Sequence, residues 1–272
     1  MRSPLNTMFN SSGAVGLLLV ALTLTSGCQQ DAETQVALPP APAEEDELSP
    51  EEVLSRMAAF LATHDDFSFE ALVTYQSLQE SGQVLHFDMV QRVAVSQPDR
   101  LFWETLEDDA RTDNAWYSDG RFVMLKQPDN IYGQIDVPNT IPEMIHVVTN
   151  DYGIVVPFSD LLARSGEPVF LQDLQAGQYV GQAWVEGEWS HHLALRNELV
   201  DFELWVQAVG DPIPLRIAIR WRLEEGLPGY VARFRKWKFS PLFDESQFHF
   251  DAPDGAERIE VLPEGAAREM DP

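Results

Sequence analysis

An alternation of bulky and basic residues between Leu215 and Leu223 constrains the fold of this chain more than any other feature. The bulky residues occupy every second position: Leu215, Ile217, Ile219, Trp221 and Leu223. The positions between them are Arg216, Ala218, Arg220 and Arg222. Because side chains of a strand point alternately to its two faces, this period of two predicts a strand with one apolar and one polar face.

The segments on either side predict neighbouring strands of the same sheet. Residues 202–206 carry Phe, Leu and Val at every second position, and Gly210-Asp211-Pro212 provides a turn before the central run. After it, Leu227-Pro228-Gly229 turns the chain into the apolar row Tyr230, Ala232 and Phe234. Trp237 and Phe239 then follow on the other parity, which predicts a β-bulge near Arg235 and Lys236. A bulge there would bend the sheet.

The rest of the chain predicts more strands and a few helices. Further strands are expected at 67–79, 84–95, 101–106, 115–118, 122–126, 131–137, 179–185 and 189–195, with an edge strand at 248–250. Ser49 and Pro50 begin a helix whose apolar face runs from Val53 to Leu61. Between Asn139 and Ala176 the period changes, and short helices are expected over 141–148, at 161–162 and through Val169, Leu171 and Leu174. The fold class is therefore α+β and mainly antiparallel β, with a helical insertion.

The N-terminus predicts export and lipidation. Residues 1–27 combine Arg2 with an apolar run of about 11 residues, which is too short to cross a bilayer. The string Leu24-Thr25-Ser26-Gly27-Cys28 resembles the lipobox of bacterial lipoproteins, although Thr25 stands where that family usually has leucine. The resemblance implies that Cys28 is acylated and anchors the protein in a membrane, and Gln29 after it favours the outer membrane, facing the periplasm. The alternative is a chance cysteine beside an ordinary cleavage site.

Composition defines the remaining segments and excludes one class of partner. Residues 28–48 are rich in proline and acidic residues and predict a disordered tether, followed by one folded domain over 49–262 and a flexible tail over 263–272. The formal net charge of -26 excludes an electrostatic contact with nucleic acid. The single cysteine cannot form a disulfide within the chain, so the fold must be stable through its core.

Several strings of the folded part resemble a family of exported bacterial proteins known only as a domain of unknown function. They are FSFEALVTYQSLQESGQVLHF (67–87), PDRLFWE (98–104), YSDGRFVML (117–125), DYGIVVPFSDLL (151–162), HHLALRNELVDFELWV (191–206) and PLRIAIRW (214–221). That family is similar in turn to the lipoprotein-carrier superfamily (LolA/LolB/LppX-like proteins). The resemblance implies an incomplete, half-open β-barrel with a helical lid over an apolar cavity, and no catalytic residues.

The function expected from these features is binding of a hydrophobic ligand, either a lipid or the acyl chain of a lipoprotein. Candidate lining residues of the cavity are Trp103, Trp205, Trp221 and Phe234. The alternative for each of these residues is that it simply fills the core. An envelope scaffold with a filled core and no ligand is accordingly the alternative for the whole protein.

The polar residues predict no reaction chemistry and one candidate docking surface. Adjacent His191 and His192 point to opposite faces of a strand, and no metal-binding spacing is present, so neither a metal nor another cofactor is expected. Seven basic residues gather between Arg216 and Lys238, and Arg216, Arg220, Arg222 and Arg233 are candidates for docking anionic groups. The alternative is cross-strand pairing with residues such as Glu203 and Glu224.

Overall fold

The computed structural model describes residues 38–42, 48–162 and 173–264. The chain divides into two units. Of Met1–Pro40 only 38–40 are described, and Ala41–Pro272 contains every described helix and strand. The predicted signal segment, Cys28, most of the tether and tail, and the expected helix through Val169 and Leu171 lie outside the described residues. Where the chain is described, no helix is both long and apolar enough to cross a membrane.

Strands are the most frequent regular element in the described part of the second unit. Its helices are α1 (Pro50–Ala62), α2 (Ile141–Asn150), α3 (Ser159–Leu162) and the 3-10 helix η2 (Glu245–Phe248). Its strands are β1 (Asp66–Leu78), β2 (Val84–Ser96), β3 (Arg100–Glu107), β4 (Thr112–Ser118), β5 (Arg121–Lys126), β6 (Ile131–Asp136), β7 (Ala176–Val185), β8 (Glu188–Arg196), β9 (Val200–Gln207), β10 (Pro214–Trp221), β11 (Gly229–Phe239) and β12 (Glu257–Ile259).

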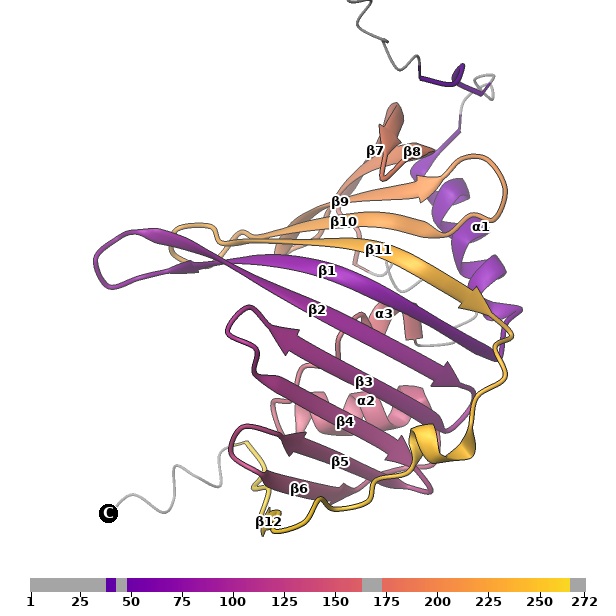
Figure 1. Ribbon diagram of the computed structural model, residues 1–272. Coiled ribbons are helices and arrows are strands. Elements are labelled where there is room, and N and C mark those ends of the chain that lie inside the picture. Colours follow the sequence, from indigo (N-terminus) through magenta and orange to yellow (C-terminus); the bar gives the residue numbers. More distant parts are fainter. Residues whose placement is uncertain (1–37, 43–47, 163–172, 265–272) are drawn as a thin grey trace, which may run out of the picture. The chain divides into compact units, whose positions relative to one another are not determined.

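All twelve described strands belong to one sheet, in the order β12-β6-β5-β4-β3-β2-β1-β11-β10-β9-β8-β7 (Figure 1). Two meanders, β1 to β6 and β7 to β11, are joined where β1 pairs with β11. The sheet ends at β7 and β12 and does not close into a barrel. The prediction of a mainly antiparallel, open barrel-like sheet with an N-terminal helix is confirmed.

The alternation that organises the sheet is present in β10. Ile217 is buried on one face and Arg220 is exposed on the other, but the strand ends at Trp221, and Leu223 beyond it is 73% exposed. The predicted β-bulge is confirmed. Between the pairs Ser68–Lys238 and Glu70–Arg235, β11 has one residue more than β1, and Lys236 has a φ of 55°. A left-handed residue of this kind is typical of bulges.

One prediction about the edge of the sheet was wrong. Residues 248–250 do not form a strand, because η2 occupies 245–248 and the side chain of Asp244 accepts a hydrogen bond from the Ser246 amide at its start. Instead, β12 is the edge strand, and it pairs with β6 in parallel within a mainly antiparallel sheet. Phe248 packs against Phe243, and Phe250 against Trp116 and Tyr132, so their apolar character reflects packing on the sheet.

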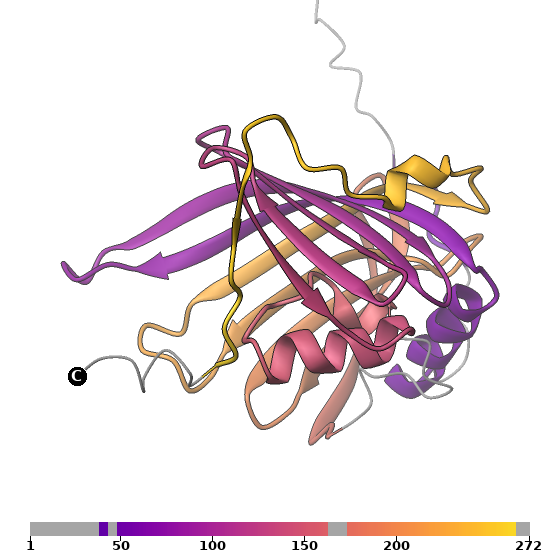
Figure 2. The same ribbon diagram turned by 90° about the horizontal axis from the view of Figure 1, so that it is seen from below.

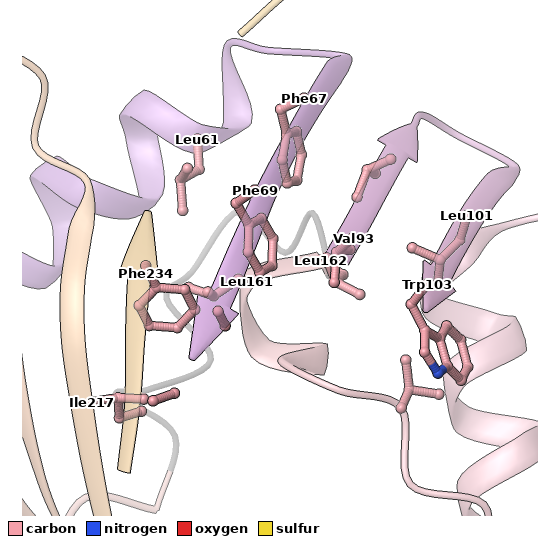
Figure 3. Packing of buried hydrophobic residues seen from close by; sticks show 14 of the residues in the cluster. Leu61, Phe67, Phe69, Val93, Leu101, Trp103, Leu161, Leu162, Ile217 and Phe234 are labelled. Carbon is pink, nitrogen blue, oxygen red and sulfur yellow. The ribbon is translucent and has the colours of Figure 1, made fainter. Parts of the chain in front are cut away.

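The helices cover the apolar face of the sheet. The hydroxyl of Ser49 caps α1, and that of Thr140 caps α2 through a contact with the Glu143 amide. Figure 1 shows α2 and α3 behind the sheet, and Figure 2 shows the sheet bending around α2. Residues from α1, α2, α3 and most strands form one buried cluster, part of which appears in Figure 3. The core therefore lies between the bent sheet and its helical cover.

Candidate functional site: an apolar groove beside the lid

A groove of about 500 Å³ remains open between the apolar face of the sheet and residues 155–161. This volume lies within the range of roughly 300–1,000 Å³ that is usual for small-molecule sites. We call it the lid groove. Its lining residues are Tyr75, Met89, Gln91, Val155, Val156, Pro157, Phe158, Ser159, Asp160, Leu161, Leu204, Pro214, Ile217, Ile219, Trp221, Tyr230 and Phe234.

The lid, residues 151–162, is docked on the sheet by aromatic and aliphatic contacts. The ring of Phe158 lies edge-on to Phe69 and Phe234, with centroid distances of 5.5 and 5.0 Å. Leu161 and Leu162 are buried, and Figure 3 shows them among Phe69 and Phe234. The side-chain amide of Gln97 also donates to the Leu162 carbonyl, at 3.0 Å. The lid thus fills one part of the space under the sheet and forms a wall of the remaining groove.

Few polar groups line this groove. Burial between its walls raises the pKa of Asp160, although part of the side chain stays accessible to solvent. Burial also raises the pKa of Tyr230 and, together with the nearby carboxylate of Glu107, that of Tyr75. Gln91 is 8% exposed; its amide nitrogen donates to Thr105 Oγ1 at 3.4 Å, and its Oε1 is buried without a hydrogen bond. The described residues that line the lid groove include no lysine, arginine or histidine.

The four predicted lining residues separate into three environments. Trp221 and Phe234 line the lid groove. Trp103 is 5% exposed and packs in the core beside Phe122, with ring centroids 5.6 Å apart. Trp205 lies on the opposite face of the sheet, stacked on His192 at 4.3 Å, and does not line the groove. Its parity explains this, because its neighbours Leu204 and Val206 face the core.

The sequence analysis missed most of the lid side of the groove. Pro157, Phe158 and Asp160 lie in a broken helical insertion, which has no period from which a facing side could be read. Tyr75 and Met89 could have been found, because they continue the alternating rows of β1 and β2 past Val73 and Gln91. The two strands meet there, with Val73 opposite Met89.

On the opposite face of the sheet, two of the clustered cations and Arg92 surround one carboxylate. Glu70 is 5% exposed and bonds to Arg235, to Lys236 at 3.2 Å and to Arg92 at 3.3 Å. Burial alone would raise the pKa of Glu70, but the hydrogen bonds from Arg235 and Lys236 outweigh it and hold the pKa below its ordinary value. Arg235 and Lys236, which lie at the β-bulge, therefore pair with the buried carboxylate of Glu70.

The four predicted docking arginines also differ in their contacts. Arg222 donates to the carbonyls of Asn197 and Glu198 at 2.8 and 3.2 Å and lies 3.7 Å from Asp201. Arg220 is exposed near the same aspartate and lowers its pKa after the larger effect of Arg196. Glu203, a partner expected for these arginines, contacts His192 instead, at 2.7 Å. Carbonyl and carboxylate contacts thus occupy Arg222.

Arg216 and Arg233 have a different arrangement. They are directly opposite one another on β10 and β11. The guanidinium of Arg216 lies 4.6 Å from the Trp205 ring centroid, and its Nε is buried without a hydrogen bond. Among the described residues no carboxylate forms an ion pair with either arginine. Two like charges therefore face each other here without a partner carboxylate.

The histidines do not form a metal site. His191 contacts the Tyr179 hydroxyl at 3.0 Å, whereas His192 contacts Glu203 on the other face. In the described part of the chain, no group of three or more histidine, cysteine, aspartate or glutamate residues is arranged to hold a metal ion.

An open, bent antiparallel sheet with a helical lid and an apolar groove defines a β protein with a potential small-molecule site on one face of its sheet. The chain belongs to the family described as predicted periplasmic protein (DUF2092), whose model matches residues 50–262. This description gives the protein a periplasmic or envelope location. No curated protein matches the chain.

Solved structures of similar architecture are distant in sequence. An uncharacterized conserved protein from Thermus thermophilus is 15% identical, with a TM-score of 0.44 and coverage of 77% of this chain and 97% of that one. A LolA superfamily protein from Nitrosomonas europaea is 11% identical (TM-score 0.37; 75% and 99% covered). The lipoprotein LppX from Mycobacterium tuberculosis is 10% identical (TM-score 0.39; 72% and 99% covered). At these low sequence identities the likeness concerns the fold alone.

Proposed function

We propose that this protein is a non-enzymatic, periplasm-facing lipoprotein that binds a hydrophobic ligand, a lipid or a lipoprotein acyl chain, in the lid groove. The observation that supports the proposal is an apolar groove of about 500 Å³ beside a lid that covers a neighbouring part of that face. Aliphatic and aromatic side chains that remain accessible on one face, such as Ile219 and Trp221, are exposed to water unless a ligand covers them.

The energy of burial favours a long chain as the ligand. Each buried methylene contributes about 0.8 kcal/mol, so ten contribute roughly 8 kcal/mol. Association costs about 4–15 kcal/mol in lost translational and rotational freedom, and this cost offsets the burial energy of a short chain. Measurable affinity therefore requires a chain of more than about ten carbons.

The test uses a neutral fluorescent probe, N-phenyl-1-naphthylamine, with delipidated full-length protein. Saturable fluorescence enhancement is expected for the wild type. Ile219→Trp should abolish it by filling the groove from β10, whereas Leu223→Trp, at a site 73% exposed beyond the same strand, should not. Native mass spectrometry of gently purified protein should also show a bound mass that delipidation removes. If no mass is bound and the probe does not respond, the groove is not a ligand site.

The alternative is an envelope scaffold with a filled core and no ligand. The packing of Trp103 against Phe122 and of Phe158 against Phe69 favours this alternative for part of the apolar face. It predicts that wild type and Ile219→Trp behave alike toward the probe. A specific partner in crosslinking experiments would then have to explain the function.

Acylation of Cys28 and attachment to the outer membrane are part of the same proposal. Their support is the string Leu24–Cys28 after a short apolar run. Two or more acyl chains give stable anchoring, at about 0.8 kcal/mol per buried methylene. Cys28→Ala should release the protein from the membrane fraction and prevent incorporation of labelled palmitate. Unchanged fractionation without palmitate incorporation by the wild type would remove the anchor from the proposal.

We also propose that Arg216 and Arg233 contact anionic lipid headgroups on the face opposite the groove. The support is the like-charged pair itself, together with the buried Arg216 Nε that has no hydrogen bond. An anion between the two guanidinium groups would relieve their repulsion and could accept that hydrogen bond.

A further inference from the structure

The charge of the lid groove limits the polar end of any ligand that it holds. Of the seventeen described residues that line it, Asp160 is the only one with a charged side chain. The arginines of β10 and β11 cannot supply a cation, because Arg216, Arg220 and Arg233 alternate with the groove-facing Ile217, Ile219 and Phe234 and so point to the opposite face. A negatively charged headgroup would therefore enter the groove without a counter-ion.

Such an entry is unfavourable on two counts. A carboxylate removed from water requires a cation or several N–H donors, and the groove provides neither a basic side chain nor an arginine fork. It would also meet the carboxylate of Asp160, whose interaction with a like charge is stronger beside apolar walls than in water.

The hydrogen-bond acceptors of the groove lining favour a ligand that donates hydrogen bonds. Gln91 directs its amide nitrogen to Thr105 Oγ1, which leaves the buried Oε1 as an acceptor without a donor. The Asp160 carboxylate is a second acceptor in the same lining, and no hydrogen bond or ion pair to it is found among the described residues. Because Gln91 Oε1 is closed off from solvent, the acceptor that a ligand can reach is the Asp160 carboxylate, to which a donor forms a charge-assisted hydrogen bond.

We infer that the lid groove binds an amphiphile whose polar end donates hydrogen bonds and carries no negative charge, and that Asp160 is the residue that excludes free carboxylates. This inference rests on the proposed function of ligand binding. Long-chain alcohols and monoacylglycerols meet the requirement. Acyl chains in ester or amide linkage also carry no negative charge, whereas a free fatty acid carries a carboxylate.

The experiment is displacement of N-phenyl-1-naphthylamine from delipidated full-length protein at pH 7.5. The competitors share one chain length: 1-hexadecanol, 1-monopalmitoylglycerol and palmitate, each below its aggregation concentration. The two uncharged competitors should displace the probe at concentrations at least about tenfold lower than palmitate, which corresponds to a difference of about 1.4 kcal/mol.

Two variants assign the preference to Asp160. Asp160→Asn keeps the shape of the side chain but removes its charge. It should strengthen the binding of palmitate, so that palmitate and the uncharged competitors displace the probe at concentrations that differ by less than about threefold. Asp151→Asn, at an exposed site of the same lid outside the groove lining, should keep the full preference. Circular dichroism and thermal melts of both variants check that the fold is intact.

Each outcome decides one of the two claims. If palmitate competes as well as hexadecanol with the wild type, or if Asp160→Asn leaves the preference unchanged, the charge inference is wrong while ligand binding stands. If the probe does not bind, or none of the three competitors displaces it, the proposed function fails and the inference fails with it.

Discussion

At the scale of single residues, the contacts of Glu70 show which basic residues have a structural role and which remain available to bind an anionic group. Its buried carboxylate bonds to Arg235, Lys236 and Arg92, and the latter also contacts Glu104. The three cations keep between 45% and 65% of their side chains exposed, whereas Glu70 keeps 6%. Most of the cost of burial is thus carried by the carboxylate, and the cations offset it. Part of the basic cluster between Arg216 and Lys238 is therefore explained by its contacts with Glu70.

Replacement of Glu70 should cause a pH-dependent loss of stability. Glu70→Gln removes charge-assisted bonds, and we expect it to lower the free energy of unfolding by about 1–3 kcal/mol at pH 7. Since the folded-state pKa of Glu70 is lowered, its contribution is complete above the unfolded pKa of about 4.3 and is lost as pH falls through the folded value. Urea unfolding should therefore show a larger difference between wild type and Glu70→Gln at pH 7 than at pH 3.

A matched control is Glu203→Gln, which removes a carboxylate that is 49% exposed beside His192. It should change stability by less than about 1 kcal/mol. Equal stability of wild type and Glu70→Gln at pH 7 would contradict the role assigned to the Glu70 cluster.

At the scale of elements, β10 and β11 carry an unfavourable pair. Arg216 and Arg233 are directly opposite one another, and like charges in that position destabilise a sheet by roughly 0.2–1 kcal/mol. Arg233→Glu would turn the pair into an attractive one and should raise the free energy of unfolding by about 0.5 kcal/mol. The same change should weaken cosedimentation with phosphatidylglycerol vesicles and leave phosphatidylcholine vesicles unaffected, as the docking proposal requires.

Arg121→Glu is a suitable control for this pair, since Arg121 is exposed on β5 and lies opposite Asp136. It removes the same charge from the protein and should leave vesicle binding closer to that of the wild type. If Arg233→Glu destabilises the protein, the two guanidinium groups do not repel each other as their register implies. If both variants lose vesicle binding equally, net charge and not a local site governs it.

Strand parity also decides how much of the site the sequence could predict. Alternation is local, so it identified the strands, the groove-facing side of Trp221 and Phe234, and the bulge at Lys236. Applied to Trp205, the same rule would have excluded this predicted lining residue, because it follows the core-facing Leu204. Whether Trp103 meets a groove or a packed core depends on where the lid docks, which is a long-range contact. Asp160 lies in that lid, and no sequence period placed it.

At the scale of the whole folded unit, one bent sheet provides both the core and the groove. The lid groove has walls from β1 and β2, from β9 to β11, and from the lid. These elements are far apart in sequence but belong to a single cooperative sheet around the β1–β11 pairing. A ligand that contacts all of them binds only where they are assembled, and so it stabilises the folded unit as a whole.

Ligand binding should accordingly raise the thermal unfolding midpoint of the entire domain. A ligand that binds only the folded state adds about 2.7 kcal/mol at a free concentration of 100 times its Kd. For a domain of this size, each kcal/mol shifts the midpoint by about 2–4 °C, so N-phenyl-1-naphthylamine at that concentration should raise it by roughly 5–10 °C. Ile219→Trp should melt at the same temperature with and without the probe, and Leu223→Trp should shift like the wild type. A probe that brightens fully but leaves the wild-type midpoint unchanged would be bound somewhere other than the assembled groove.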